Sequence, residues 1–161
     1  MKFAEFMCVE AIRPNCDVGT KEELMCELVG ALVEAGQIKS DDQADIVKAI
    51  IRREELGTTA IGSGFAIPHV KHPTIDRVVG TVGIVSGGID FNSLDGKPTE
   101  VFFLLLSPVE TPTFHLRAME KVARHLKDEM FCRFLNQAPA AADIVELLQD
   151  ADQPQFAHAS A

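Results

Sequence analysis

The sequence predicts an α/β fold, a single domain in which three layers, α/β/α, are built on a small mixed sheet. Helical patterns precede and follow a middle segment, starting near residue 57, in which glycines stand between β-branched residues typical of strands. The uninterrupted apolar run at residues 101–106 predicts a strand that is buried on both faces. Such a strand needs helices on each face of its sheet, which gives the three layers.

The first two helices are predicted from the signals at their ends. Thr20 begins a capping box, with a glutamate three residues later, and Gly36 is placed to close that helix in the left-handed conformation. Ser40 begins a second box, and Gly57 stands just beyond the end of the second helix.

Strands follow, and then helices again. Asp95-Gly96 predicts a tight turn between a partly exposed strand at residues 78–85 and the buried central strand at 101–106. Thr111 is the expected N-cap of the next helix, with Pro112 at its first position. Short helices are expected around 131–135 and 144–148. One side of the helix that follows Pro112 is expected to carry Leu116, Met119, Val122, Ala123 and Leu126.

Size, charge and cysteines limit the class of protein. The chain has 161 residues, 47% of them apolar, and a formal net charge of −9. We expect one domain over residues 1–150 and a frayed tail at 151–161. The charge repels nucleic acid and anionic membranes, and no apolar stretch approaches the roughly 20 residues that a bilayer requires. The four cysteines match no metal-ligand spacing, so we expect reduced thiols, no disulfides and a cytoplasmic location.

His69 is the first candidate functional residue. It ends a glycine-rich segment, residues 57–69, whose glycines can turn the backbone and bring N–H groups close to an anion. Pro68 restricts the backbone that leads into the histidine. A neutral imidazole is a good nucleophile near pH 7, and a phosphoryl group bound to it can be given up again. The alternative is a structural histidine whose ring is tied to backbone carbonyls.

A phosphoryl group also requires donors and positive charge. Arg53, at the end of the second helix, is the nearest cation in sequence, with Arg52 as the fallback, and Thr59 is expected to bind the group as well. His115 lies in the first turn of its helix, where unpaired N–H groups favour an anion. His69 and His115 are thus the expected site histidines. Of the other three, His72 is expected in a solvated turn, His125 on the outer face of its helix and His158 in the tail.

Three motifs together resemble a known family. They are residues 53–57 (Arg-Glu-Glu-Leu-Gly), residues 61–69 (Ile-Gly-Ser-Gly-Phe-Ala-Ile-Pro-His) and the helix-opening pair His115-Leu116. They resemble the enzyme IIA domains of the fructose/mannitol class of the bacterial phosphoenolpyruvate-dependent sugar phosphotransferase system, particularly the nitrogen-regulatory branch. The resemblance extends over about residues 20–150.

This resemblance implies a three-layer α/β/α domain in which His69 is phosphorylated by a histidine-containing phosphocarrier protein. It also implies that His115 stabilises the phosphoryl group, that Arg53 supplies charge, and that no metal or organic cofactor is needed. The group would pass to a IIB domain, or its presence would control a regulatory target protein. The chain would then be a component of a phosphotransferase rather than a free-standing enzyme.

Two other functions remain open. The chain can be an interaction module of nitrogen or metabolic control, without a role in sugar transport, in which phosphorylation only switches a protein contact. His69 and His115 can also bind a divalent metal, although two histidines without a third ligand motif are a weak zinc signal. For partner docking, Phe65, Val70 and Phe114 are candidates for an exposed apolar rim, with burial in the core as the alternative.

Overall fold

Strand β4 (Thr99–Ser107) lies at the centre of the sheet in the computed structural model, which describes residues 1–153. β3 (Val79–Ile89) pairs with it in antiparallel direction, and β1 (Phe65–Ala66) and β2 (His69–Lys71) pair with it in parallel. β1 and β2 keep the same register offset against β4, so they lie end to end along one of its edges. The predicted mixed sheet with the apolar run at its centre is therefore confirmed.

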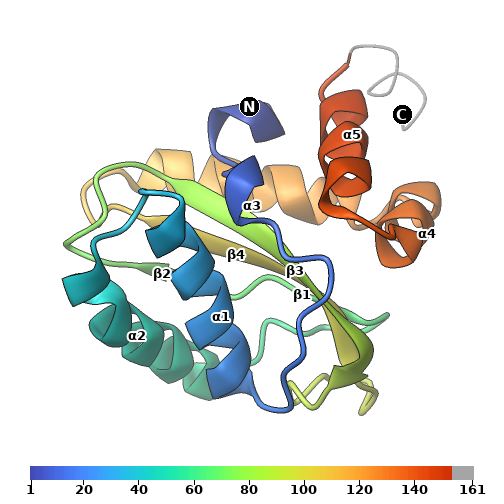
Figure 1. Ribbon diagram of the computed structural model, residues 1–161, viewed down its shortest axis with the longest axis horizontal. Coiled ribbons are helices and arrows are strands. Elements are labelled where there is room, and N and C mark those ends of the chain that lie inside the picture. Colours follow the sequence, from blue (N-terminus) through green and yellow to red (C-terminus); the bar gives the residue numbers. More distant parts are fainter. Residues whose placement is uncertain (154–161) are drawn as a thin grey trace.

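Helices cover both faces of this sheet (Figure 1). α1 (Lys21–Glu34) and α2 (Gln43–Leu56) lie on one face, and α3 (Pro112–His125), α4 (Glu129–Gln137) and α5 (Ala141–Ala151) lie on the other. Successive residues of β4 point to opposite faces, as the pleat requires. Phe102 and Leu104 thus pack in the α1/α2 core, whereas Phe103 and Leu105 pack in the core under α3, α4 and α5. The predicted three layers are confirmed.

The ends of α1 follow the sequence signals, but the start of α2 does not. The Thr20 hydroxyl accepts a hydrogen bond from the Glu23 N–H at 3.2 Å, and Gly36 has a φ of +78°. At the second helix, Ser40–Asp42 forms a 3-10 turn, and α2 begins after it, at Gln43, without a side-chain cap. The local sequence therefore predicts the position of α2 correctly, but it predicts an α-helical first turn with a side-chain cap where the structure has a 3-10 turn.

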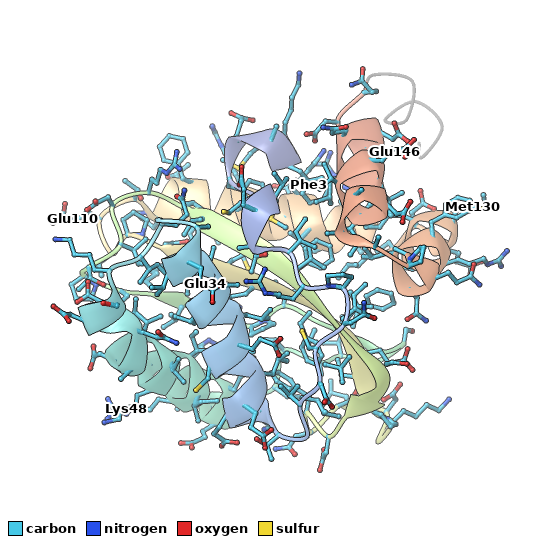
Figure 2. The ribbon with its side chains drawn as sticks, viewed as in Figure 1. Phe3, Glu34, Lys48, Glu110, Met130 and Glu146 are labelled. Atoms are coloured by element: carbon cyan, nitrogen blue, oxygen red, sulfur yellow. The ribbon has the colours of Figure 1, made fainter. Side chains whose placement is uncertain are left out.

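The first residues of the chain line the second edge of β3. This segment contains two 3-10 turns, Phe3–Glu5 and Val9–Ala11, and it forms hydrogen bonds with β3, among them Cys8 N–H to the Gly80 carbonyl at 2.8 Å. At Gly80 a Cβ would lie 2.8 Å from the Leu104 carbonyl oxygen, so only glycine fits between the segment and β4. Figure 2 labels Phe3, which lies where this segment meets α5.

The connection from β3 to β4 differs from the predicted tight turn. Gly96 has a φ of +73°, and its N–H donates to the Ser93 carbonyl, so a turn forms at this point. It lies, however, within a longer loop at residues 90–98, and β3 is buried along most of its length rather than half exposed. The N-terminal segment and the two helical layers cover β3, and none of these contacts is visible in the local sequence.

The buried face of α3 is also different from the prediction. Its buried residues include His115, Ala118, Val122 and His125, whereas Leu116 is 65% exposed. The periodicity of the apolar residues failed here because the buried stripe contains two histidines, which a hydrophobicity pattern assigns to the surface.

The remaining expectations concern the termini, membranes and cysteines. The frayed tail predicted at 151–161 is wrong at its start, because Ala151 is a buried residue of α5 and the Asp152 carboxylate pairs with Lys121. Residues 154–161, including His158, lie outside the described residues. Within residues 1–153, no helix is both long and apolar enough to cross a bilayer. All four cysteines are free thiols, as expected from their spacing.

Candidate active site

His69 is fixed at the start of β2, immediately after Pro68. Its Nδ1 lies 2.8 Å from the carbonyl oxygen of Ile67. A carbonyl oxygen can only accept a hydrogen bond, so Nδ1 carries the ring proton in the neutral imidazole. The lone pair therefore resides on Nε2, which is the nitrogen available to attack an electrophile.

The surroundings of His69 keep its ring neutral. Partial burial lowers its pKa below 6.5, the nearby Arg53 charge lowers it further, and only the hydrogen bond to Ile67 and the carboxylate of Glu54 act in the other direction. At neutral pH the ring is therefore a nucleophile rather than a cation.

His115 lies beside His69, although a long stretch of chain separates the two. The ring centroids are 5.4 Å apart, and the ring planes make an angle of 47°. His115 is buried in the first turn of α3, and its Nδ1 lies 2.5 Å from the Ser107 hydroxyl oxygen at the end of β4. The first turn of α3, which contains unpaired N–H groups, therefore lies beside the carboxyl end of β4.

His115 is also held in the neutral form. Burial lowers its pKa, from 6.5 to about 4, with additional contributions from His69 and from the positive charge of Lys71. Since His115 is neutral at pH 7, it carries one ring proton, and it can donate one hydrogen bond through the nitrogen that bears this proton.

Arg53 and Glu54 bring the end of α2 to the site. The Arg53 guanidinium donates to the Gly57 carbonyl at 3.1 Å and is close enough to lower the pKa of His69. Glu54 is buried, and its carboxylate accepts hydrogen bonds from the N–H of Thr59 at 3.0 Å and from its hydroxyl at 2.5 Å. The two residues therefore fix the glycine-rich loop to the helix. Both donors of Thr59 are directed to Glu54.

Sequence reasoning missed Lys71 and Ser107, although each carries a signal. Lys71 follows His69 by two residues in a strand, so the two side chains lie on the same face of the sheet. Ser107 is the first polar residue after the apolar run 101–106, and the register pairs it with Lys71. Ligands commonly bind at the carboxyl ends of parallel strands. A cation and a hydroxyl at the carboxyl ends of two neighbouring strands therefore indicate a binding site for an anion.

The structure corrects the expectations for His72 and His125. His72 is buried rather than solvated, because its Nε2 binds the Asp45 carboxylate at 2.6 Å and its Nδ1 binds the Thr74 hydroxyl at 2.7 Å. His125 is buried rather than on the outer face, against the rings of Phe3 and Phe131. Both positions depend on partners that are distant in sequence.

Apolar side chains are exposed on α3 on either side of His115 in the sequence. Phe114 and Leu116, which flank His115 on α3, are 50% and 65% exposed, whereas Phe65 and Val70 are only partly buried members of the two cores. A groove of about 240 Å³ between the glycine-rich loop and α3 is lined by Phe65 together with Ile61 and Leu126. Phe114 is thus the most exposed of the three residues predicted to form a rim.

A metal site has no third ligand at this position. Within residues 1–153, no three side chains of His, Cys, Asp or Glu gather as metal ligands do, at the histidine pair or elsewhere. The groups near His69 and His115 include the cations Arg53 and Lys71 and the hydroxyl of Ser107, which are suited to an anion.

Comparison of the sequence with known proteins shows the family to which the chain belongs. The sequence model described as "Phosphoenolpyruvate-dependent sugar phosphotransferase system, EIIA 2" matches residues 5–151. The chain is 33% identical over 148 residues to a nitrogen regulatory protein of Bradyrhizobium diazoefficiens, covering 92% of this chain and 95% of that protein.

Solved structures agree in fold. The crystal structure of nitrogen regulatory protein IIA-Ntr from Neisseria meningitidis superposes with a TM-score of 0.81 at 27% identity, covering 91% of this chain and 98% of that one. An Escherichia coli complex of enzyme IIA-Mtl and phosphorylated enzyme IIB-Mtl matches with a TM-score of 0.72 at 19% identity, covering 88% of this chain and 95% of that one. The second likeness concerns the fold alone.

Proposed function

Because the chain belongs to the EIIA 2 family of the phosphoenolpyruvate-dependent sugar phosphotransferase system, we propose that it carries a phosphoryl group on Nε2 of His69. The observation that supports this most directly is the convergence of the two imidazoles at 5.4 Å, with Nδ1 of His69 held by a carbonyl and Nε2 left free. Family membership gives a phosphocarrier or regulatory role, and the residue and the atom are our proposal.

The transfer needs little covalent machinery from the protein. The Nε2 lone pair of His69 attacks the phosphorus of a phosphohistidine on the donor, an N–P bond forms as the donor's N–P bond breaks, and the donor imidazole leaves with the electron pair. His69 keeps its proton on Nδ1, so positive charge develops on its ring. The Ile67 carbonyl, which accepts the Nδ1–H hydrogen bond at 2.8 Å, stabilises this charge.

Charged and polar groups around His69 would hold the transferred group. Arg53 supplies a fixed cation, Lys71 supplies a second, and His115 donates one N–H. Thr59 would be a further donor. Its hydroxyl now donates to the Glu54 carboxylate, and this hydrogen bond would have to break before the hydroxyl could donate to a phosphoryl oxygen. In an acidic chain with a formal net charge of −9, these groups make the site locally favourable for an anion.

The donor would be a histidine-containing phosphocarrier protein, and the acceptor a IIB domain or a regulatory target. The likeness to nitrogen regulatory proteins in sequence and in fold supports the regulatory alternative, in which the phosphorylation state controls a protein contact. The apolar surface around Phe114 and Leu116 is suited to either kind of partner.

The test is incubation of the protein with phosphoenolpyruvate and the general phosphotransferase components, followed by intact mass measurement. Wild type should gain one acid-labile phosphoryl group, His69→Ala should gain none, and His115→Ala should be labelled slowly or lose the group quickly. Equal labelling of all three proteins would refute the assigned roles. A chase with a IIB domain then separates the two functions, because only a carrier passes the group on.

A further inference from the structure

The Ser107 side chain has a single hydrogen-bond partner among residues 1–153, the Nδ1 atom of His115 at 2.5 Å. Ser107 is fully buried, since it ends the central strand β4 and α3 covers it. Neither the serine hydroxyl nor this ring nitrogen can therefore exchange its partner for bulk water.

Burial decides in which direction the proton of this hydrogen bond points. If Nδ1–H donated to the serine oxygen, the hydroxyl proton would have no acceptor, and a buried donor without an acceptor is costly. If the hydroxyl donates to Nδ1, every proton of the pair is satisfied and only an oxygen lone pair lacks a partner. The second arrangement is the more stable one, and it requires the ring proton of neutral His115 to reside on Nε2.

We propose that Ser107 is a positioning residue, which holds His115 as the Nε2–H tautomer and so provides the hydrogen-bond donor for a phosphoryl group on His69. This inference rests on the proposed function. It assigns Ser107 no contact with the group, because the serine acts only through the ring of His115.

The tautomer matters because His115 is neutral and has one proton to offer. With the proton on Nε2, the ring donates to a phosphoryl oxygen; with the proton on Nδ1, it would turn a lone pair toward the negatively charged group and repel it. Burial and the neighbouring Lys71 keep the ring from gaining a second proton near neutral pH. Ser107 thus determines whether His115 supports the phosphohistidine or opposes it.

The first measurement is the tautomeric state of His115 in the wild-type protein, from long-range ¹⁵N–¹H correlation spectra of its ring at pH 7. We expect a protonated Nε2 and an unprotonated Nδ1. In Ser107→Ala, the Nδ1–H form should become populated. A wild-type ring with its proton on Nδ1, or a ring whose spectrum is the same in Ser107→Ala, would overturn the proposal.

The second measurement is the rate of phosphorylation by the donor protein. We expect Ser107→Ala to react about tenfold more slowly, the effect of one lost hydrogen bond, and Ser107→Thr, which keeps the hydroxyl, to recover most of the rate. Thr99→Val is the matched control, because it removes a buried hydroxyl from the same strand that has no hydrogen-bond partner within residues 1–153. It should react like wild type.

These outcomes separate the inference from the function on which it rests. If wild type is phosphorylated and Ser107→Ala reacts at the same rate, the positioning role is wrong and the phosphocarrier function stands. If wild type is not phosphorylated at all, the proposed function fails, whatever the tautomer of His115.

Discussion

Lys71 and Ser107 are register partners on the parallel strands β2 and β4, so the ammonium group near the two histidines and the hydroxyl that binds His115 come from the carboxyl ends of adjacent strands. The first turn of α3 lies at this end of the sheet as well, because its residue His115 binds Ser107. The site is therefore assembled at the carboxyl ends of two neighbouring strands, where a helix begins.

Lys71→Met should raise the pKa of both His69 and His115. The positive charge of Lys71 lowers these pKa values, so its removal makes protonation of each ring easier. Titration of the ring protons by NMR measures the effect. Lys48→Met is the control, since Lys48 projects from α2 (Figure 2) and is not among the charges that act on either ring. Unchanged pKa values in Lys71→Met would contradict the electrostatic description of the site.

Arg53→Ala should slow phosphorylation of His69 by about a hundredfold, the typical cost of removing a fixed donor from a developing anion. Arg52→Ala serves as the matched control, because Arg52 is the exposed neighbour on the same helix and is not among the charges that shift the pKa of His69. The rates are measured with the same donor protein. Equal slowing in both variants would show that general surface charge, rather than the placed guanidinium, accounts for the effect.

Stability should fall on mild acidification. The unfolded chain protonates a histidine near pH 6.5, whereas burial lowers the pKa of folded His115 to about 4 and lowers those of His69 and His125 in the same direction. Between pH 6.5 and 4 the unfolded state thus binds more protons, and the free energy of unfolding decreases as the pH decreases. Above pH 6.5 these residues contribute no pH dependence.

Urea unfolding of wild type and His115→Gln at pH 7.5 and pH 5 measures this contribution. Wild type should lose more stability than the variant over this interval, because the variant lacks one of the three imidazoles whose pKa is lowered in the folded state. A wild-type protein that gains stability on acidification would contradict the assignment of buried, neutral histidines.

Asp152→Ala should destabilise the fold by about 3 kcal/mol without changing the chemistry at His69. The Asp152 carboxylate accepts hydrogen bonds from the N–H groups of Phe3 and Ala4 at 2.8 and 3.0 Å and pairs with the buried Lys121 ammonium at 3.2 Å. Removing it leaves a buried cation without its counter-ion. Urea unfolding gives the change, with the exposed Asp150→Ala as control; equal stability of the two variants would show that this contact is dispensable.

Local signals predicted much of the fold. The N-cap of α1 at Thr20, the proline at the start of α3 and the apolar run of β4 each depend on neighbouring residues, and each is present in the structure. The pairing of His69 with His115 came from combining motifs, since neither histidine alone distinguishes a functional ring from a structural one.

The errors have a common cause, which is contact between distant parts of the chain. His72 is buried because Asp45 reaches it from α2, and His125 is buried because Phe3 and Phe131 enclose its ring. Hydrophobic periodicity treats a histidine as a surface residue, so it cannot find a buried stripe that contains two of them. The hydrogen bond between Ser107 and His115 also joins separate elements, β4 and α3, and both partners are buried because α3 packs on β4. The local sequence around either residue does not predict it.

The most direct test of the proposed site is the identity of the phosphorylated atom. The ¹⁵N-labelled protein is phosphorylated by the donor, and the ring nitrogens of His69 are observed for a one-bond coupling to phosphorus. We predict coupling to Nε2, with Nδ1 still protonated and hydrogen-bonded to the Ile67 carbonyl. Coupling to Nδ1 of His69, or to a nitrogen of any other histidine, would contradict the proposed site.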